Sequence, residues 1–126
     1  MSDMGTFRTT IEVENLRVGQ RRIVEGALVD TGSEYTCIPS PILESLGIKP
    51  EVPLTFRLAD GRTLERRLGM AIVHVEGRKA PDWVVFGEPG DIVLLGAHSL
   101  EGLNYRVDPR AKRFVDAGPV IAASAA

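Results

Sequence analysis

A run of apolar residues ends in an acidic one at Asp30, and no other feature restricts the possible folds of this chain as strongly. Residues 27–29, Ala-Leu-Val, have the continuous apolar character of a strand that enters a core. A carboxylate at the end of such a strand is costly to bury unless hydrogen bonds compensate for its lost hydration. The following Thr31-Gly32-Ser33 can supply them, because glycine allows a sharp turn with free amide donors and the two hydroxyls add more. We therefore expect a turn that holds one carboxyl group rigidly.

The length and composition predict one globular domain. A chain of 126 residues can bury one hydrophobic core, so we expect a single domain over residues 1–126 with its core at about 6–116. A net charge of -2 gives no reason to expect nucleic acid or a membrane as a partner. The paired basic residues at 21–22, 66–67 and 112–113 keep nucleic acid as an alternative. It is a minor one, because nearby acids balance these pairs.

The cysteine count and the first residues predict a cytoplasmic location. Cys37 is the only cysteine, so no internal disulfide can form and no oxidising compartment is indicated. Residues 1–6 show no pattern of a signal peptide, and no apolar run approaches the length of a membrane span.

The periodicity of the chain predicts mostly β structure with two short helices. A helix is expected over residues 40–46, with Ser40 as its N-cap, Pro41 at its first position and Gly47 as its stop. A second helix is expected over residues 98–103, and Asp60-Gly61 should turn a long hairpin. Residues 117–126 are expected to form a flexible tail, or alternatively a strand added to a partner's sheet. The expected strands cover residues 6–13, 22–29, 54–59, 63–75, 79–86, 92–95 and 113–115.

Several motifs in order give the chain a family resemblance. Leu28-Val29-Asp30-Thr31-Gly32-Ser33 is the active-site signature of aspartic proteases, and Leu94-Leu95-Gly96 before a short helix is their second hallmark. Between them, residues 58–62, Leu-Ala-Asp-Gly-Arg, stand where these enzymes carry a flap. Leu100-Glu101 and Val107-Asp108-Pro109 complete the set. Over residues 6–115 the chain resembles the retropepsin-like (clan AA) single-domain aspartic proteases of the prokaryotic type.

The resemblance implies a closed, barrel-like β domain with a flap hairpin, acting as a homodimeric endopeptidase. In this family two facing carboxylates share a proton: one activates a water and the other polarises the scissile carbonyl. Because this chain has one Asp-Thr-Gly, the second Asp30 must come from another copy. Thr31 would bond the partner's backbone beneath the site. No metal or other cofactor is implied, and acidic pH should favour the reaction.

The resemblance also assigns residues to a site for an extended peptide. Asp30, Thr31 and Gly32 form the catalytic group. The substrate-binding residues would be Ser33, Glu34, Leu58, Ala59, Asp60, Gly61, Ile92 and Leu94. The viral members pair an acid at the position of Glu34 with an arginine just after the second glycine. Here that position is Ala97, so this chain lacks the arginine of that dimer bridge.

Other chemistries find less support in the residues. Cys37 with His74 or His98 would make a thiol protease, but its apolar surroundings favour a buried structural cysteine. Ser33 has no motif that ties a histidine to it, and the cysteine and histidines lack the spacing of a zinc site. A different class stays open: a dimer of the same fold that binds peptides as a scaffold without useful turnover.

Overall fold

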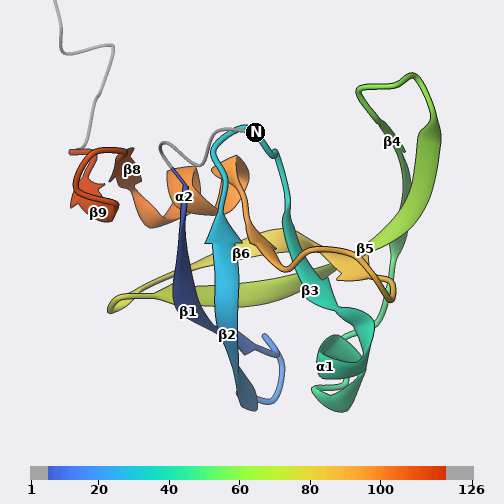
Figure 1. The fold of residues 1–126 in the computed structure, drawn as a ribbon. Helices are drawn as coiled ribbons and strands as arrows, with labels where there is room; N and C mark the ends of the chain where they lie inside the picture. The colour runs from blue at the N-terminus through green and yellow to red at the C-terminus, as the bar shows by residue number, and fades with distance from the viewer. Residues whose placement is uncertain (1–5, 119–126) are drawn as a thin grey trace, which may run out of the picture.

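A computed structural model describes residues 6–118 of the chain, which form a closed β-barrel with one long projecting hairpin (Figure 1). The two short helices are α1 (Ser40–Ser45) and α2 (Ala97–Leu103). The strands are β1 (Phe7–Glu14), β2 (Arg21–Val29), β3 (Thr36–Pro39), β4 (Val52–Arg57), β5 (Thr63–Val75), β6 (Arg78–Gly87), β7 (Leu94–Leu95), β8 (Tyr105–Asp108) and β9 (Arg113–Asp116). The expectation of a mainly β, barrel-like fold with short helices is confirmed.

The barrel closes because β1 pairs on both of its edges. The strands follow one another in the order β1-β2-β7-β3-β6-β5, and β5 then pairs again with β1 through Val13 and Val73. Most neighbours are antiparallel, but β2 runs parallel to β7 and β3 runs parallel to β6. Closure gives β1, β2, β3, β5, β6 and β7 each a neighbour on both sides along part of their length.

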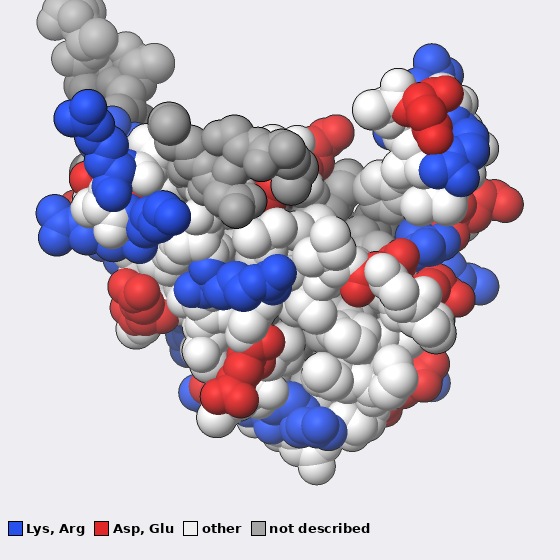
Figure 2. Space-filling view, viewed as in Figure 1, with Lys and Arg blue, Asp and Glu red and all other residues white. Residues whose placement is uncertain are grey.

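We call the part of β4 and β5 that extends beyond the barrel the flap hairpin, because the resemblance leads us to expect a flap there. Pairing of β4 with β5 runs from Val52↔Leu68 to Arg57↔Thr63, whereas β5 joins β6 only from Leu68 onward. Residues 52–67 therefore project from the barrel, as the raised green hairpin in Figure 1 shows. Figure 2 shows a hollow between this hairpin and the rest of the molecule.

Two apolar clusters stabilise this arrangement. The main core fills the barrel with alternate residues of the strands, among them Val13, Val29, Val73 and Leu95, all with almost no exposed surface. The second cluster, Cys37, Leu68 and Val85, lies under the flap and is covered by partly buried side chains. These are Tyr35, Leu54, Phe56, Trp83 and Leu94.

Several local expectations were wrong at the ends of elements. Ser40 is the first residue of α1 and not its cap: Pro39 is the N-cap, and the Ser40 hydroxyl donates to the carbonyl oxygen of Gly87 instead. The chain does leave α1 through Gly47, whose φ of +75° is readily adopted by glycine. The strand expected at 92–95 is only Leu94–Leu95.

The sequence pattern does not predict β3 and β8. Each has only four residues, and the period of two is hard to recognise over so short a stretch. Of the expected tail, residues 119–126 lie outside the described part of the chain. Between residues 6 and 118, both helices fall well short of the length and apolar character that a membrane span requires.

Candidate active site

The Asp30 turn, residues 30–33, begins where β2 leaves the barrel beside β7. Leu28 and Val29 pair with Leu94 and Leu95, and the Asp30 amide donates to the Leu95 carbonyl oxygen at 3.1 Å. The carboxylate then receives two local hydrogen bonds. The Gly32 amide donates to Oδ1 at 2.9 Å, and the Ser33 hydroxyl donates to Oδ2 at 3.1 Å. The turn thus holds the carboxylate in one orientation, as its composition suggests.

A second loop, at the β7–α2 junction, is locked onto the Asp30 turn. The amide of Ala97 donates to the Ser33 carbonyl oxygen at 2.7 Å, and the amide of His98 donates to that of Glu34 at 2.9 Å. The approach requires glycine at position 96, because a Cβ there would lie 2.6 Å from the carbonyl carbon and oxygen of Tyr35. The two motif segments, far apart in sequence, form one rigid unit beneath the carboxylate.

Buried hydroxyl groups connect this unit to the barrel. Thr36 and Ser99 are almost fully buried, and their hydroxyl oxygens lie 2.6 Å apart. Thr36 Oγ1 also accepts from the Gly96 amide at 3.1 Å, while Ser99 donates to Asp82 Oδ2 at 2.8 Å. The network satisfies polar groups that would otherwise be costly in the core, and it positions the glycine that supports Asp30.

A half-cleft of about 460 Å³ lies between the Asp30 turn and the flap hairpin. It brings together six of the residues expected to form the catalytic and substrate-binding site: Gly32, Ser33, Glu34, Leu58, Ile92 and Leu94. The other residues that line it were not predicted as site residues: Tyr35, Cys37, Phe56, Arg57, Leu64, Arg66, Val85 and Asp91. Phe56 could have been found by following the period of two inward from Leu58, and Leu64 and Arg66 share a face of β5 by the same period; Arg57 does not follow this pattern.

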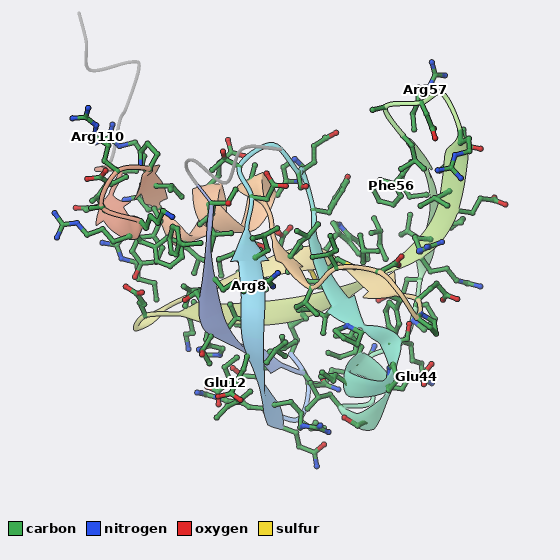
Figure 3. All side chains as sticks on the ribbon, in the orientation of Figure 1. Arg8, Glu12, Glu44, Phe56, Arg57 and Arg110 are labelled. Carbon is green, nitrogen blue, oxygen red and sulfur yellow. The ribbon has the colours of Figure 1, made fainter. Side chains whose placement is uncertain are left out.

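The turn of the flap hairpin contains Ala59, Asp60 and Gly61, which line neither the half-cleft nor the cavity described below. Asp60 organises this turn by accepting from the Arg62 amide at 2.9 Å and its Nε at 2.6 Å. Gly61 has a φ of +89°, which favours glycine. Figure 3 shows Phe56 on the side of the hairpin that faces the body of the molecule and Arg57 at its outer end.

One wall of the half-cleft carries a bidentate ion pair between Arg66 and Asp91. Arg66 Nε donates to Asp91 Oδ2 at 2.7 Å and Nη2 to Oδ1 at 2.9 Å. The Arg66 hydrogen bond lowers the pKa of Asp91 below its ordinary range, against the opposing effect of burial. At the base of the half-cleft, burial raises the pKa of Cys37 to about 11, so this thiol is neutral and behaves as a small apolar group.

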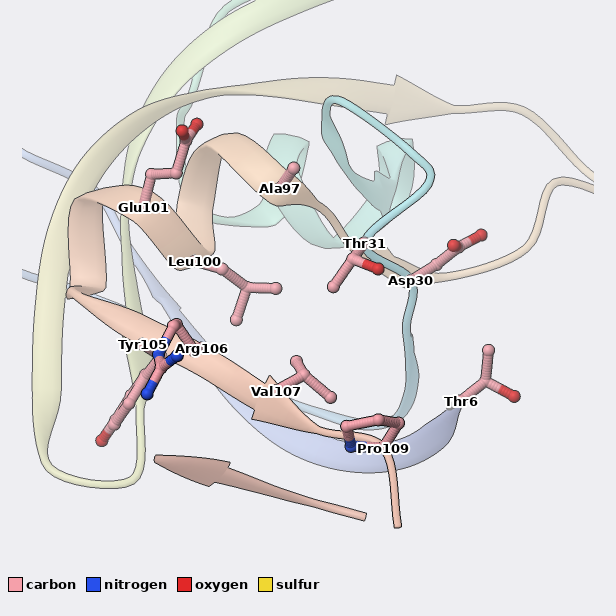
Figure 4. A pocket seen from close by; sticks show the side chains of 10 residues that line it. All are labelled: Thr6, Asp30, Thr31, Ala97, Leu100, Glu101, Tyr105, Arg106, Val107 and Pro109. Carbon is pink, nitrogen blue, oxygen red and sulfur yellow. The ribbon is translucent and has the colours of Figure 1, made fainter. Parts of the chain in front are cut away.

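On the other side of Asp30 lies the α2–β8 cavity, about 570 Å³ in volume (Figure 4). Asp30 and Thr31 form one end of it, and Leu100 and Val107 are part of its apolar lining. Within residues 6–118 the Thr31 hydroxyl has no hydrogen-bond partner, and this side chain is exposed. Asp30 therefore stands between two concave surfaces, the half-cleft and this cavity.

A match to a known family model identifies the protein family of this chain. The family model described as "gag-polyprotein putative aspartyl protease" matches residues 15–102, which include the Asp30 turn, the flap hairpin and the β7–α2 junction. The chain belongs to this aspartyl protease family. It is an aspartic-type peptidase, and the resemblance seen in its motifs to the retropepsin-like proteases is confirmed. A search of curated proteins found no match.

A solved structure supports the fold of this aspartyl protease. The solution structure of the simian foamy virus (mac) protease is similar to it with a TM-score of 0.51 and 21% sequence identity. The similarity covers 75% of this chain and 92% of the viral one. At this identity the likeness establishes the retropepsin-like fold.

Among residues 6–118, no group of three or more His, Cys, Asp or Glu side chains is arranged to hold a metal ion.

Proposed function

We propose that the protein is a homodimeric aspartic endopeptidase whose active site contains one Asp30 from each subunit. The observation that carries this proposal is that the chain has a single Asp-Thr-Gly turn, built to orient one carboxylate. Hydrolysis by this chemistry needs two carboxylates that share a proton. A two-fold axis beside Asp30 supplies the second from an identical turn.

In the proposed mechanism the ionised Asp30 takes a proton from water, and the oxygen of that water attacks the scissile carbonyl carbon. The protonated Asp30 of the other subunit donates its proton to the carbonyl oxygen, which gives a tetrahedral diol. Collapse of the diol breaks the C–N bond: the Asp30 that took the proton from water donates it to the leaving amine, and the other Asp30 takes a proton back from one diol hydroxyl. Gly32 and Ser33 keep each carboxylate in place during these transfers through their hydrogen bonds to Oδ1 and Oδ2.

The α2–β8 cavity is the proposed docking surface for the second copy. It adjoins Asp30 and contains the unpartnered hydroxyl of Thr31, which would bond the partner's backbone. Its lining includes Glu101 and Arg106, two exposed side chains of opposite charge. Neither forms an ion pair within residues 6–118, so each is available to the other across a two-fold interface.

The substrate is proposed to be an extended peptide laid between the Asp30 turn and the flap hairpin. Gly32, Ser33, Ala59, Asp60 and Gly61 would hold its backbone. Glu34, Leu58, Ile92 and Leu94 would contact its side chains, and the last three give the half-cleft much of its apolar wall.

Two further assignments are part of this proposal. We place the chain with the prokaryotic retropepsin-like proteases on its motifs Leu58-Ala59-Asp60-Gly61 and Val107-Asp108-Pro109, as one domain over residues 1–126. A cytoplasmic location is proposed because the buried Cys37 is the only cysteine.

Substitution Asp30→Asn tests the proposal. It removes the ionisable group and nearly preserves its shape, so cleavage of an unfolded protein substrate should be abolished while dimerisation persists. Glu25→Gln is the matched control: Glu25 is exposed on the same strand, and its variant should cleave as well as the unaltered protein. Undiminished cleavage by the Asp30→Asn variant would remove Asp30 from the mechanism. Peptide binding without cleavage by the unaltered protein would favour the scaffold alternative.

A further inference from the structure

We propose that Arg66 and Asp91 act as a positioning pair that pins the base of the flap hairpin to the loop before β7 and thereby sets the width of the substrate half-cleft. The activity part of this inference rests on the proposed peptidase function. The structural part, which concerns the mobility of the flap hairpin, stands without it.

The two side chains form a bidentate ion pair that fixes their relative orientation. Within residues 6–118 it is the only contact in which one guanidinium donates two hydrogen bonds to one carboxylate, at 2.7 and 2.9 Å. Its side chains are also well shielded, with exposed fractions of 16% for Arg66 and 24% for Asp91. The pair at the flap turn, Arg62 with Asp60, is 76% and 52% exposed. Shielding from water and a bidentate geometry make an ion pair stronger and more specific in its direction.

Arg66 lies at the root of the flap hairpin. It is opposite Leu54 in the β4–β5 ladder, two residues before Leu68, where β5 begins to pair with β6. Among the described residues, positions 63–66 of β5, which lead from here to the tip of the hairpin, pair with β4 alone. A contact at this point therefore limits how far the hairpin can bend relative to the barrel.

Asp91, the other residue of the pair, lies in a well-defined turn. Its Oδ2 accepts from the Glu88 amide at 2.8 Å, and its own amide donates to the Glu88 carbonyl oxygen at 2.9 Å. The next residue, Ile92, is 57% exposed and lines the half-cleft. The pair thus joins the flap, which forms one wall of the half-cleft, to the loop that carries an apolar residue of the opposite wall.

The surrounding groups favour the charged form of the pair. Besides Asp91, the titratable groups that act on Arg66 are Glu88, whose charge supports the guanidinium, and Cys37, whose pKa of about 11 keeps it neutral. Hydrogen bonding to Arg66 lowers the pKa of Asp91. A lowered pKa keeps this contact charged further into the acid range than an ordinary aspartate would allow.

The consequence for catalysis is a role in binding peptide and not in the chemical step. The pair lies on the wall of the half-cleft, away from the hydrogen bonds that orient Asp30. Its loss should let the hairpin and loop separate and weaken contacts to the peptide in the ground state and transition state alike. Such a loss raises KM and leaves kcat nearly unchanged.

A double-mutant cycle tests the pair. Asp91→Asn retains the shape and the bond from the Glu88 amide, and Arg66→Gln retains part of the side chain. Each variant should raise KM for an unstructured peptide about tenfold with kcat within about twofold, and the double variant should be no worse than either single one. Arg66→Lys, which keeps the charge but not the second hydrogen bond, should fall between. Glu12→Gln, which breaks an exposed ion pair with Arg21, is the control and should change neither parameter.

Amide hydrogen exchange separates this inference from the proposed function. In Asp91→Asn, exchange should accelerate in residues 54–66 and 88–93 but not in β1 or β2, whether or not the protein cleaves peptides. If the unaltered protein lacks activity but this pattern is seen, the proposed function fails and the pairing role stands. Unchanged exchange in the flap hairpin, or additive effects in the cycle, would overturn the inference.

Discussion

Asp30 and Asp91 show how neighbouring groups give two carboxylates in one protein different tasks. Asp30 receives one amide and one hydroxyl hydrogen bond, both from residues of its own turn. Asp91 is instead held by a guanidinium from another strand, which lowers its pKa. The first carboxylate lines the α2–β8 cavity, where the proposed mechanism uses it for chemistry, whereas the second is held in an ion pair that favours its charged form.

The lowered pKa of Asp91 predicts how stability depends on pH. A carboxyl whose folded-state pKa lies below its ordinary value of 3.8 contributes stability that is fully present above 3.8. That contribution is lost as the pH falls through the folded-state pKa. The free energies of unfolding of the unaltered protein and Asp91→Asn, measured by urea denaturation, should therefore differ at pH 6 and begin to converge once the pH falls below 3.8. A difference that stayed constant over this range would contradict the assignment.

At the scale of elements, the crossing of the β7–α2 junction over the start of β3 decides the shape of the site. Gly96 packs against the backbone of Tyr35, and the amides that follow it bind the carbonyl groups of Ser33 and Glu34. Thr36, the first residue of β3, secures the same glycine through its hydroxyl. Short strands with little intrinsic preference are thus held by contacts between distant parts of the chain.

Substitution Gly96→Ala should damage this crossing. A methyl group 2.6 Å from the Tyr35 carbonyl cannot be accommodated without moving backbone, since both contacting atoms belong to the main chain. Overpacking of this kind costs about 1–3 kcal/mol. We expect a matching loss in the free energy of unfolding and faster amide exchange at Ala97 and His98. An unchanged unfolding transition would show that the two loops can separate without cost.

At the scale of the molecule, the proposed dimer explains why a catalytic signature occurs once in the chain. Asp30 lies between the half-cleft and the α2–β8 cavity, so a copy docked on the cavity would bring its own Asp30 turn to the same place. The opposite charges of Glu101 and Arg106 suit a symmetric interface, in which each contact is made twice.

Charge reversal tests that interface. Glu101→Arg and Arg106→Glu should each weaken dimerisation in sedimentation experiments at several concentrations, because each places like charges together across the interface. The double reversal should restore dimerisation, and specific activity should follow the dimer fraction in all three variants. Full dimerisation of both single variants would place the interface elsewhere.

Local sequence determined the parts of this protein that depend on neighbours along the chain. Two local patterns gave correct predictions. The apolar run before Asp30 and the donors after it predicted the turn, and the alternation of residues 63–75 predicted the strand, because hydrogen bonding and burial at these positions depend on nearby residues. Only the tertiary structure decided which strands that no hairpin joins lie side by side, where the short strand β3 fits, and that Arg66 meets Asp91. Those features join residues 25 or more positions apart, and such contacts arise from barrel closure and the filling of a shared core, which no single stretch of sequence specifies.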